Sequence, residues 1–512
     1  MASIRFTGTS GIDVDSIVKQ LMTARKSTLN KLNQQKTTLE WTQQQYRDIN
    51  IKLVDFRNNK LFNYGLQGSI NAKQANVTGN TTAVSAKANA GAISGTMTVE
   101  VDALATAATL KSRGGGLNKT LDPSKSLSDL KAAGLINYKK DADGNITFKL
   151  SNGANSDTIT LNESGSLSSL ITTINGSKAN VNAFLDSQTG QMSFSSKNTG
   201  AGEIKIDSDA SGFLANFQLT DSTPGKDTVG LKINGIAVTR SSNVFTENGV
   251  EITLNGPTGG VKSSISVVSN TDKIIETIKS FITDYNDVLN TVNNKINEER
   301  YRKYPPLTSE QKEEMKDSEI ELWESKAKSG LLRNDSTLSK LSSDLRLSMI
   351  TDVNIGGTKV NLTSLGITTG EWSQRGKLAI QDEAKLRAAI EANPDQVLAL
   401  FTQQSSASDP AVKASPSNPD NGLFNRLSNV LMSALDGLAS KAGTSKYSTD
   451  ANASFLTTSS ISTSLRLLDI RIDDENDRLD RLEAQYYKQF SAMETAMSRY
   501  SAQAGSLFGA SN

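Results

Sequence analysis

The amino-acid sequence predicts an α+β multidomain protein, in which terminal coiled-coil helices and a helical stalk domain carry two nested β-rich head domains. Apolar residues recur every seven positions at both ends of the 512-residue chain, which indicates long helices. Apolar and polar residues alternate in the middle of the chain, which indicates β-strands. Because helical sequence flanks the β sequence on both sides, we expect the head to be inserted into the stalk.

The N-terminal helix is expected to begin at Asp13, whose side chain suits a helix N-cap. Between residues 25 and 45, polar residues such as Arg25, Gln35 and Thr42 occupy inner heptad positions. This stretch should therefore be marginal without partners. The apolar heptad positions are Val18, Leu21, Leu32, Leu39, Tyr46, Ile49, Leu53 and Phe56.

From about residue 70 the sequence predicts strands, with Asn234-Gly235 and Asn255-Gly256 as tight turns between some of them. A short helix at about 166–175 interrupts the strands. The clearest alternating runs are Met97-Val99-Val101, Ile146-Phe148-Leu150, Val181-Ala183-Leu185, Met192-Phe194, Ile204-Ile206, Val250-Ile252-Leu254 and Ile265-Val267.

Helix returns at Asp272, where apolar residues are spaced by three and four as far as Ile296. Asn393-Pro394 should end a later helix, and Ser405 to Asn421 should form an exposed loop. The C-terminal helix has one apolar seam, made of Leu465, Leu468, Ile472, Leu479, Leu482, Tyr486, Met493, Ala496 and Tyr500.

This order of elements predicts a division of the chain into a stalk, a head and two legs. The expected parts are 1–45 as a flexible N-terminal leg helix, 46–75 and 271–460 as the helical stalk domain with a small β element, 76–112 and 228–270 as a β head domain, 113–227 as an inserted outer β head domain, and 461–512 as the C-terminal coiled-coil leg.

The composition argues against several classes of function. Lys and Arg number 55 against 54 Asp and Glu, so the chain has no basic excess for nucleic acid or anionic membrane. It has neither cysteine nor histidine, which removes thiolate and imidazole chemistry. No apolar run is long enough to span a bilayer, and the first 16 residues contain no secretory apolar segment. An enzyme with this composition would lack the cysteine and histidine side chains that catalytic sites most often use.

Three local patterns have both a functional and a structural reading. The acidic run at 473–477 lacks the spacing of a calcium loop, so a solvated helix face is favoured. Residues 113–116, Arg followed by three Gly, lack the rest of a phosphate-binding motif, and a flexible linker is favoured. Tyr301, Tyr304 and Trp323 could form a carbohydrate or nucleic-acid platform, but aromatic packing that caps a pair of helices is favoured.

Near the N-terminus, Ser10 to Val18 followed by Leu21-Met22 resembles the signature of the flagellar filament cap proteins, the flagellar hook-associated protein 2 (FliD) family. Lys26-Ser27-Thr28 departs from it, because the family commonly has an acidic residue and proline there. The segments similar to the flagellin-type IN motif are Ser166 to Asn175, Val181 to Ala183 and Phe194 to Ser196. Those similar to the family's C-terminal region are Tyr304 to Thr308, Trp323-Glu324, Gly330 to Leu332, Leu365 to Ile367, Gly376 to Leu378 and Gln489 to Glu494.

The resemblance implies a secreted, non-enzymatic assembly factor at the distal tip of the bacterial flagellar filament, without a cofactor or metal. Family members leave the cell unfolded through the flagellar type III export machinery, and an export chaperone is expected. They form a homo-oligomeric ring whose terminal legs contact flagellin and let each new subunit fold beneath the cap. Some also bind host mucin, an adhesive activity that is assigned to no residue here.

The leg seams could close on each other within the chain or bind another molecule, and we favour use between molecules. The alternative functions are a hook–filament junction protein and an extracellular carboxylate-dependent hydrolase. The expected leg interface consists of Val18, Leu21, Leu32, Leu39, Leu465, Leu468, Ile472, Leu479, Leu482, Tyr486 and Met493.

Overall fold

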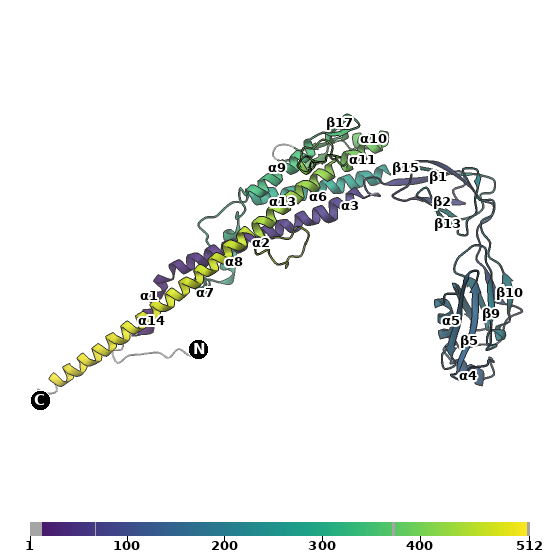
Figure 1. Cartoon of the computed structure of the whole chain (residues 1–512), viewed down its shortest axis with the longest axis horizontal. Helices are drawn as coiled ribbons and strands as arrows, with labels where there is room; N and C mark the ends of the chain where they lie inside the picture. Colours follow the sequence, from purple (N-terminus) through teal and green to yellow (C-terminus); the bar gives the residue numbers. More distant parts are fainter. Residues whose placement is uncertain (1–12, 67, 371–373, 509–512) are drawn as a thin grey trace. The chain divides into compact units, whose positions relative to one another are not determined.

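The computed structural model describes residues 13–66, 68–370 and 374–508, and the chain divides into two compact units (Figure 1). Unit 1 combines the two ends of the chain, up to Ile70 and from Thr271 onward, and unit 2 is Asn71–Asn270. Unit 1 is mainly helical and unit 2 is mainly β. The α+β class and the insertion of β elements between helical segments are therefore confirmed.

In unit 1, α2 packs against α13 and α14, and α6 packs against α9. A π-helical turn, η1, joins α2 to α3. The N-terminal helices are α1 (Val14–Arg25), α2 (Ser27–Asp55), η1 (Phe56–Leu61) and α3 (Phe62–Gly65). The later helices are α6 (Thr271–Asn297), α7 (Ser309–Glu313), α8 (Asp317–Lys328), α9 (Ser336–Ile350), η3 (Leu362–Leu365), α10 (Glu383–Ala392), α11 (Pro394–Thr402), α12 (Pro410–Ala414), α13 (Leu423–Ala442) and α14 (Ser460–Phe508).

Two small hairpins complete unit 1, β16 (Val353–Ile355) with β17 (Thr358–Val360) and β18 (Ile367–Thr369) with β19 (Leu378–Ile380). The helix predicted from Asp272 is α6. Its residues at three- and four-residue spacing, from Ile274 to Val292, are buried, as an amphipathic helix requires. The helix break predicted at Asn393 is also present, because Pro394 is the first residue of α11.

The first two sheets of unit 2 enclose a core that includes Val99, Val250 and Ile265. The five-stranded sheet has the order β1-β15-β3-β11-β12, and the three-stranded sheet has the order β13-β14-β2. Their strands are β1 (Lys73–Thr78), β2 (Val84–Ala88), β3 (Gly95–Glu100), β11 (Lys232–Ile233), β12 (Ile236–Ala237), β13 (Val244–Glu247), β14 (Val250–Leu254) and β15 (Ser263–Ser269).

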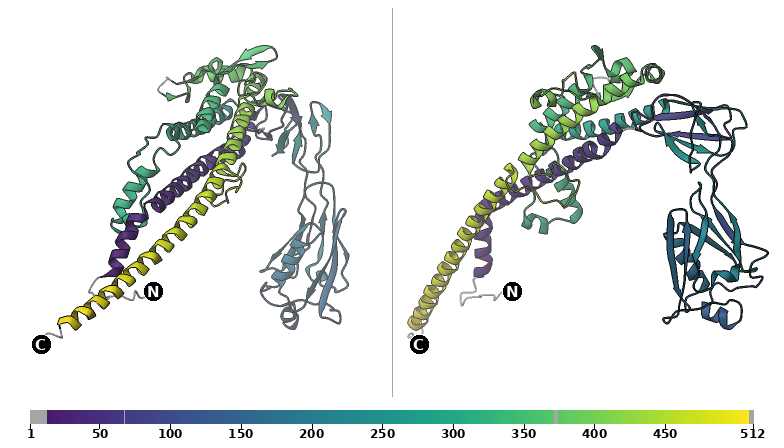
Figure 2. Two further views of the ribbon diagram at one scale, coloured as in Figure 1. Left: turned by 60° about the vertical axis from the view of Figure 1, so that its left-hand side comes forward. Right: turned by 45° about the vertical axis from the view of Figure 1, so that its right-hand side comes forward.

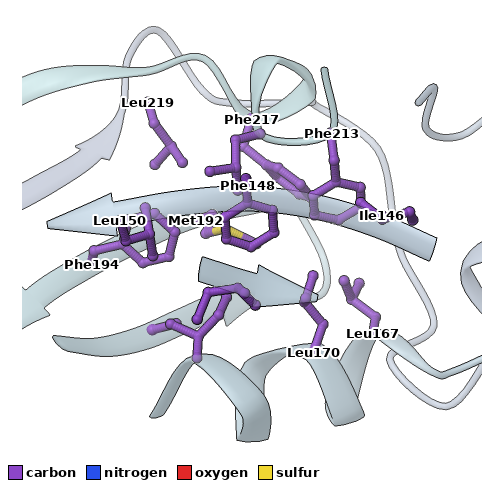
Figure 3. Packing of buried hydrophobic residues seen from close by; sticks show 14 of the residues in the cluster. Ile146, Phe148, Leu150, Leu167, Leu170, Met192, Phe194, Phe213, Phe217 and Leu219 are labelled. Carbon is purple, nitrogen blue, oxygen red and sulfur yellow. The ribbon is translucent and has the colours of Figure 1, made fainter. Parts of the chain in front are cut away.

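A second core in unit 2 lies between two further sheets and α5 (Leu167–Gly176) (Figure 3). Every second residue of β5 is buried, including Phe148, which stacks on Phe213 with ring centroids 6.3 Å apart. The sheets have the orders β10-β4-β8-β7 and β6-β5-β9. Their elements are β4 (Thr109–Ser112), α4 (Leu127–Ala132), β5 (Asn145–Asn152), β6 (Asn155–Asn162), β7 (Val181–Asp186), β8 (Gln191–Ser196), β9 (Ile204–Ser208), η2 (Leu214–Phe217) and β10 (Leu219–Thr223).

One of the two predicted tight turns is wrong. Asn234-Gly235 turns β11 into β12, with positive φ at both residues, but Asn255-Gly256 does not close a hairpin. The chain leaves β14 there and crosses to β15 in the other sheet, and both residues donate backbone hydrogen bonds to Ala83. The missed turn is Asn248-Gly249, where both φ angles are positive and Glu247 pairs with Val250.

The glycine run at 113–116 is a turn inside the second core, not a linker between domains. All three glycines have positive φ, and a Cβ on Gly116 would lie 3.0 Å from the Cα of Gln191. β4, which precedes the turn, pairs with both β8 and β10. The inner sheet therefore begins at Thr109, before the expected domain boundary at residue 113.

The segment from Ser405 to Asn421 was expected to be an exposed loop, and this is wrong for its ends. Ser405, Asn418 and Asn421 are buried. The backbone N–H of Ser405 donates to the side chain of Asn421 at 2.9 Å, and Asn418 contacts the fully buried Arg426 of α13. The guanidinium of Arg426 donates to the carbonyl oxygens of Asn418 at 2.7 Å, Ser348 at 3.3 Å, Thr351 at 2.6 Å and Asp352 at 2.6 Å.

Three of these carbonyls lie at the C-terminal end of α9 or just beyond it, where the helix dipole favours a positive charge. Burial lowers the pKa of the Arg426 guanidinium to about 10, so the side chain remains charged at neutral pH. One buried cation therefore joins α9, α13 and the segment before α13.

We predict that Arg426→Met reduces the free energy of unfolding of unit 1 by roughly 3 kcal/mol, because buried carbonyl oxygens lose their donors. The sequence of unit 2 contains no tryptophan, and Trp41 and Trp323 belong to unit 1, so tryptophan fluorescence during urea unfolding reports on this unit. Arg333→Met, at an exposed position, is the control and should change the free energy by less than about 0.5 kcal/mol. Equal effects of the two substitutions would contradict the prediction.

Candidate assembly interface on the terminal helices

The first candidate contact joins α1 to α14. Asp13 caps α1 by accepting a 3.1 Å hydrogen bond from the backbone of Ser16, as the sequence predicts. Val14, Val18 and Met22 of α1 then form a buried cluster with Leu479 of α14. Leu482 and Tyr486 of α14 are partly buried against this cluster, together with Leu29 and Phe490.

Leu21, which the heptad pattern places in the seam, is 39% exposed, and Met22 is buried instead. The apolar face of α1 follows Val14, Val18 and Met22, four residues apart, which is the spacing of a straight helix. The chain then turns at Lys26 before α2 begins at Ser27. A heptad register that runs unbroken through residue 26 therefore does not describe this segment.

The second candidate contact joins the first half of α2 to the first half of α14. Leu32 and Leu468 are buried, whereas Leu39, Leu465 and Ile472 are partly buried. Lys36 pairs with Asp469 at 2.7 Å, and this pairing raises the pKa of the Lys36 ammonium group.

Farther along α2, polar side chains form hydrogen bonds to backbone carbonyl oxygens. Gln43 donates to the carbonyl of Ala442 at 2.8 Å, and Asn50 donates to that of Ser445 at 2.7 Å. Between them, Arg47 donates to Ala451 and Ala453 at 2.9 and 2.7 Å. The three side chains, spaced by four and three residues, bind the connection between α13 and α14. No role was predicted for these three residues from the sequence.

A charged cluster lies beside this connection. The hydroxyl of Tyr46 in α2 donates to the Asp335 carboxylate at 2.6 Å, and Lys441 in α13 also pairs with it. Burial alone would raise the pKa of Asp335, but the bonds from Lys441, Tyr46 and the Leu338 backbone outweigh burial and hold that pKa below its usual range. Burial and the bond to Asp335 raise the pKa of Tyr46.

The last third of α14 continues beyond the end of α1 as a single helix (Figure 2). Met493, Met497 and Tyr500 are 39%, 40% and 71% exposed, and they repeat at intervals of four and three residues. Within the described residues no other helix covers this stripe. Met493, expected in the leg interface, is thus not brought together with the other members.

The three local patterns have structural roles. Tyr304 packs on Trp323 at a centroid distance of 4.7 Å and on Tyr301 at 6.2 Å, so the expected aromatic packing is present. The acidic run at 473–477 lies on α14, where Glu475 pairs with Arg478 at 2.7 Å.

Across residues 13–66, 68–370 and 374–508, no group of acidic residues is arranged to hold a metal ion. No helix in these ranges is long and apolar enough to cross a bilayer.

Comparison with known families gives matches at both ends of the chain. The sequence model of the flagellar hook-associated protein 2 N-terminus matches residues 10–108, and that of its C-terminus matches residues 228–502. The model of the flagellin hook IN motif matches residues 145–198, which include the segments identified as IN-like. Of the N-terminal signature, Ser10 to Ile12 lie outside the residues that the structure describes.

Individual relatives agree with these matches. Flagellar hook-associated protein 2 of Halalkalibacterium halodurans is 32% identical over 97% of this chain and 98% of its own length. The protein of the same name from Escherichia coli K12 is 25% identical over 97% of this chain and 96% of its length. The crystal structure of the flagellar cap protein FliD D1-D2-D3 domains from Escherichia coli covers 85% of this chain and 99% of that chain, with 21% identity and a TM-score of 0.47.

We predict that Asp335→Asn lowers the free energy of unfolding of unit 1 by about 2 kcal/mol at pH 7, because Lys441 loses its counter-charge. The folded-state pKa of Asp335 lies below its ordinary value. The carboxylate therefore contributes fully above about pH 4, and the contribution is lost as the pH falls through the folded pKa. The difference between the two proteins should shrink accordingly in urea unfolding followed by tryptophan fluorescence.

The control for this experiment is Asp287→Asn in α6, where the carboxylate is 63% exposed and pairs with Lys52 at 3.1 Å. It should cost less than about 0.5 kcal/mol at every pH. A difference for Asp335→Asn that stays constant from pH 7 to pH 2 would show that the carboxylate charge is not responsible.

Proposed function

The chain belongs to the flagellar hook-associated protein 2 family, and we propose that it caps the distal tip of the flagellar filament as a ring, where it retains exported flagellin and promotes its folding and polymerisation. The observation that carries the proposal is the division of α14 into a covered part and an uncovered part. The proposed partners are further copies of this chain, flagellin, the flagellar type III export machinery and an export chaperone. The proposed site of action lies outside the cell.

The uncovered stripe of α14 supports a contact with another molecule. Met493, Met497 and Tyr500 are exposed on one helical face of a 49-residue helix. A helix stabilises itself mainly by burying such a face, and methionine adapts to partner surfaces of different shape. We therefore assign this stripe to flagellin or to the leg of a neighbouring copy.

The covered part supports a contact that can open and close. Among the described residues, the buried cluster between α1 and α14 consists of Val14, Val18, Met22 and Leu479. Burying each side chain contributes roughly 1.5 to 3 kcal/mol. Fixing the 12-residue α1 backbone costs about 1 to 2 kcal/mol per residue, which is at least as much as the burial of these side chains contributes. A leg of this kind could detach and rebind each time a subunit is added below the cap.

The alternative position, at the hook–filament junction, is less well supported, because the matches to hook-associated protein 2 cover both terminal regions. The two positions lie at opposite ends of the filament. Immunogold labelling of intact cells should therefore place gold particles at the free filament end. Gold confined to the base of the filament would contradict the proposed position.

We predict that replacing both Leu479 and Leu482 with Asp abolishes capping, because one charge would enter the buried cluster between α1 and α14 and the other would lie against it. The β-rich unit does not contain these residues and should remain folded. Cells should release monomeric flagellin into the medium and carry few or short filaments. The measurement compares flagellin in the culture supernatant with filament length on the cell.

The control carries the same added charge at exposed positions of the same helix, Asn476→Asp with Gln485→Asp. This protein should cap normally. Filaments of normal length in cells that secrete the folded Leu479→Asp, Leu482→Asp protein would overturn the proposed role of the seam.

A further inference from the structure

A groove of about 560 Å³ opens between α2, the segment before α7 and α14. We call it the basic groove, because Lys31, Arg300 and Arg302 line it and none of its lining residues is acidic. Its apolar walls are formed by Leu39 and Leu468. The other lining residues are Gln34, Gln35, Thr38, Tyr304, Pro305 and Pro306.

Hydrogen bonds to the backbone of Pro305 and Pro306 fix the segment before α7 that lines the groove. Gln34 of α2 donates to the carbonyl of Pro306 at 2.8 Å, and Trp323 of α8 donates to that of Pro305 at 2.7 Å. The guanidinium of Arg300 already forms hydrogen bonds within the chain, because it donates to the carbonyls of Ala327 and Ser329 at 2.6 and 3.1 Å. The available cations are therefore Lys31 and Arg302, which are exposed and form no ion pair within the described residues.

A surface of complementary character lies on the outer side of α14. We call Leu467, Ile470, Asp474 and Asp477 the outer stripe, since residues three and four apart share one face of a helix. Leu467 and Ile470 are each 53% exposed. Asp474 and Asp477 are exposed, and neither forms an ion pair in the part of the chain that the structure describes.

We propose that the outer stripe of one copy docks into the basic groove of a second copy of this chain. Leu467 and Ile470 would meet the apolar walls, and Asp474 and Asp477 would face Lys31 and Arg302. A groove and a stripe on different surfaces make a head-to-tail contact, which closes into a ring when the rotation between copies allows it. This inference rests on the proposed ring and names the contact that builds it.

A chain cannot fill its own groove in this way. Leu468 already forms part of the groove wall, and each successive residue turns by about 100° around the helix. The neighbouring Leu467 and the more distant Ile470 are therefore directed away from the groove that Leu468 lines. The stripe stays available to another copy.

The test uses two charge-reversal variants of the full-length chain. The groove variant carries Lys31→Glu with Arg302→Glu, and the stripe variant carries Asp474→Lys with Asp477→Lys. Sedimentation velocity over a concentration series should show self-association weakened at least tenfold in each variant. A chain that carries all four substitutions should recover most of the association, because the charges are exchanged. Circular dichroism confirms that each variant is folded.

Mixing the two variants gives a sharper result. The intact stripe of the groove variant can bind the intact groove of the stripe variant, and the two reversed surfaces also carry opposite charges. An equimolar mixture should therefore recover the association that neither variant shows alone. A control with Lys139→Glu and Lys178→Glu, two exposed lysines of unit 2, should associate like the unchanged chain.

The outcomes separate this inference from the proposed ring. If the unchanged chain forms rings and both variants form them equally well, the groove contact is wrong and the ring stands. If the variants form rings but lose binding to purified flagellin, the groove has a different occupant and the inference is also overturned. An unchanged chain that stays monomeric at every soluble concentration overturns the ring and the groove contact together.

Discussion

The hydrogen bonds from α2 to the connection between α13 and α14 decide how unit 1 is assembled. The two segments of this unit are separated in the sequence by the 200 residues from Asn71 to Asn270, so only non-covalent contacts align them. An apolar seam tolerates a shift along the helix, whereas Gln43, Arg47 and Asn50 satisfy particular carbonyl oxygens and fix one register. The charged cluster of Tyr46, Asp335 and Lys441 then ties α2 to α9 and α13. The leg contacts and the basic groove both depend on this alignment.

Periodicity predicted the elements whose burial is regular. The alternation of β5 and the three- and four-residue spacing of α6 are visible in the sequence because one face of each element is buried along its whole length. Arg426 was missed, because a lone arginine in an apolar helix carries no signal until the carbonyls around it are known. The turn at Asn248-Gly249 was missed for a similar reason, since the six Asn-Gly pairs of the chain look alike and pairing of the flanking strands decides which of them form hairpins.

The candidate interface was predicted in part. Val18, Leu479, Leu482 and Tyr486 come together as the heptads suggested, while Met22 takes the buried position expected for Leu21. A heptad repeat requires one continuous helix, whereas the chain turns at Lys26 between α1 and α2. The basic groove had no sequence signal, because its walls come from three segments as distant as Lys31, Arg302 and Leu468. Whether the interface acts between molecules stays a prediction.

The long sequence separation within unit 1 also implies an order of folding. The carbonyl that accepts the hydrogen bond from Gln43 lies 399 residues away, so the contact between α2 and the connection from α13 to α14 cannot form until the end of the chain is present. Unit 2 contains all of its own sheets within Asn71–Asn270 and can close earlier, since loop closure between nearer residues costs less entropy. A chain that emerges from a narrow channel with its N-terminus first would therefore hold a folded β unit while its helical ends are still unpaired. The final closure of unit 1 would then coincide with release of the C-terminus, which makes completion of the molecule itself the signal that the legs are ready.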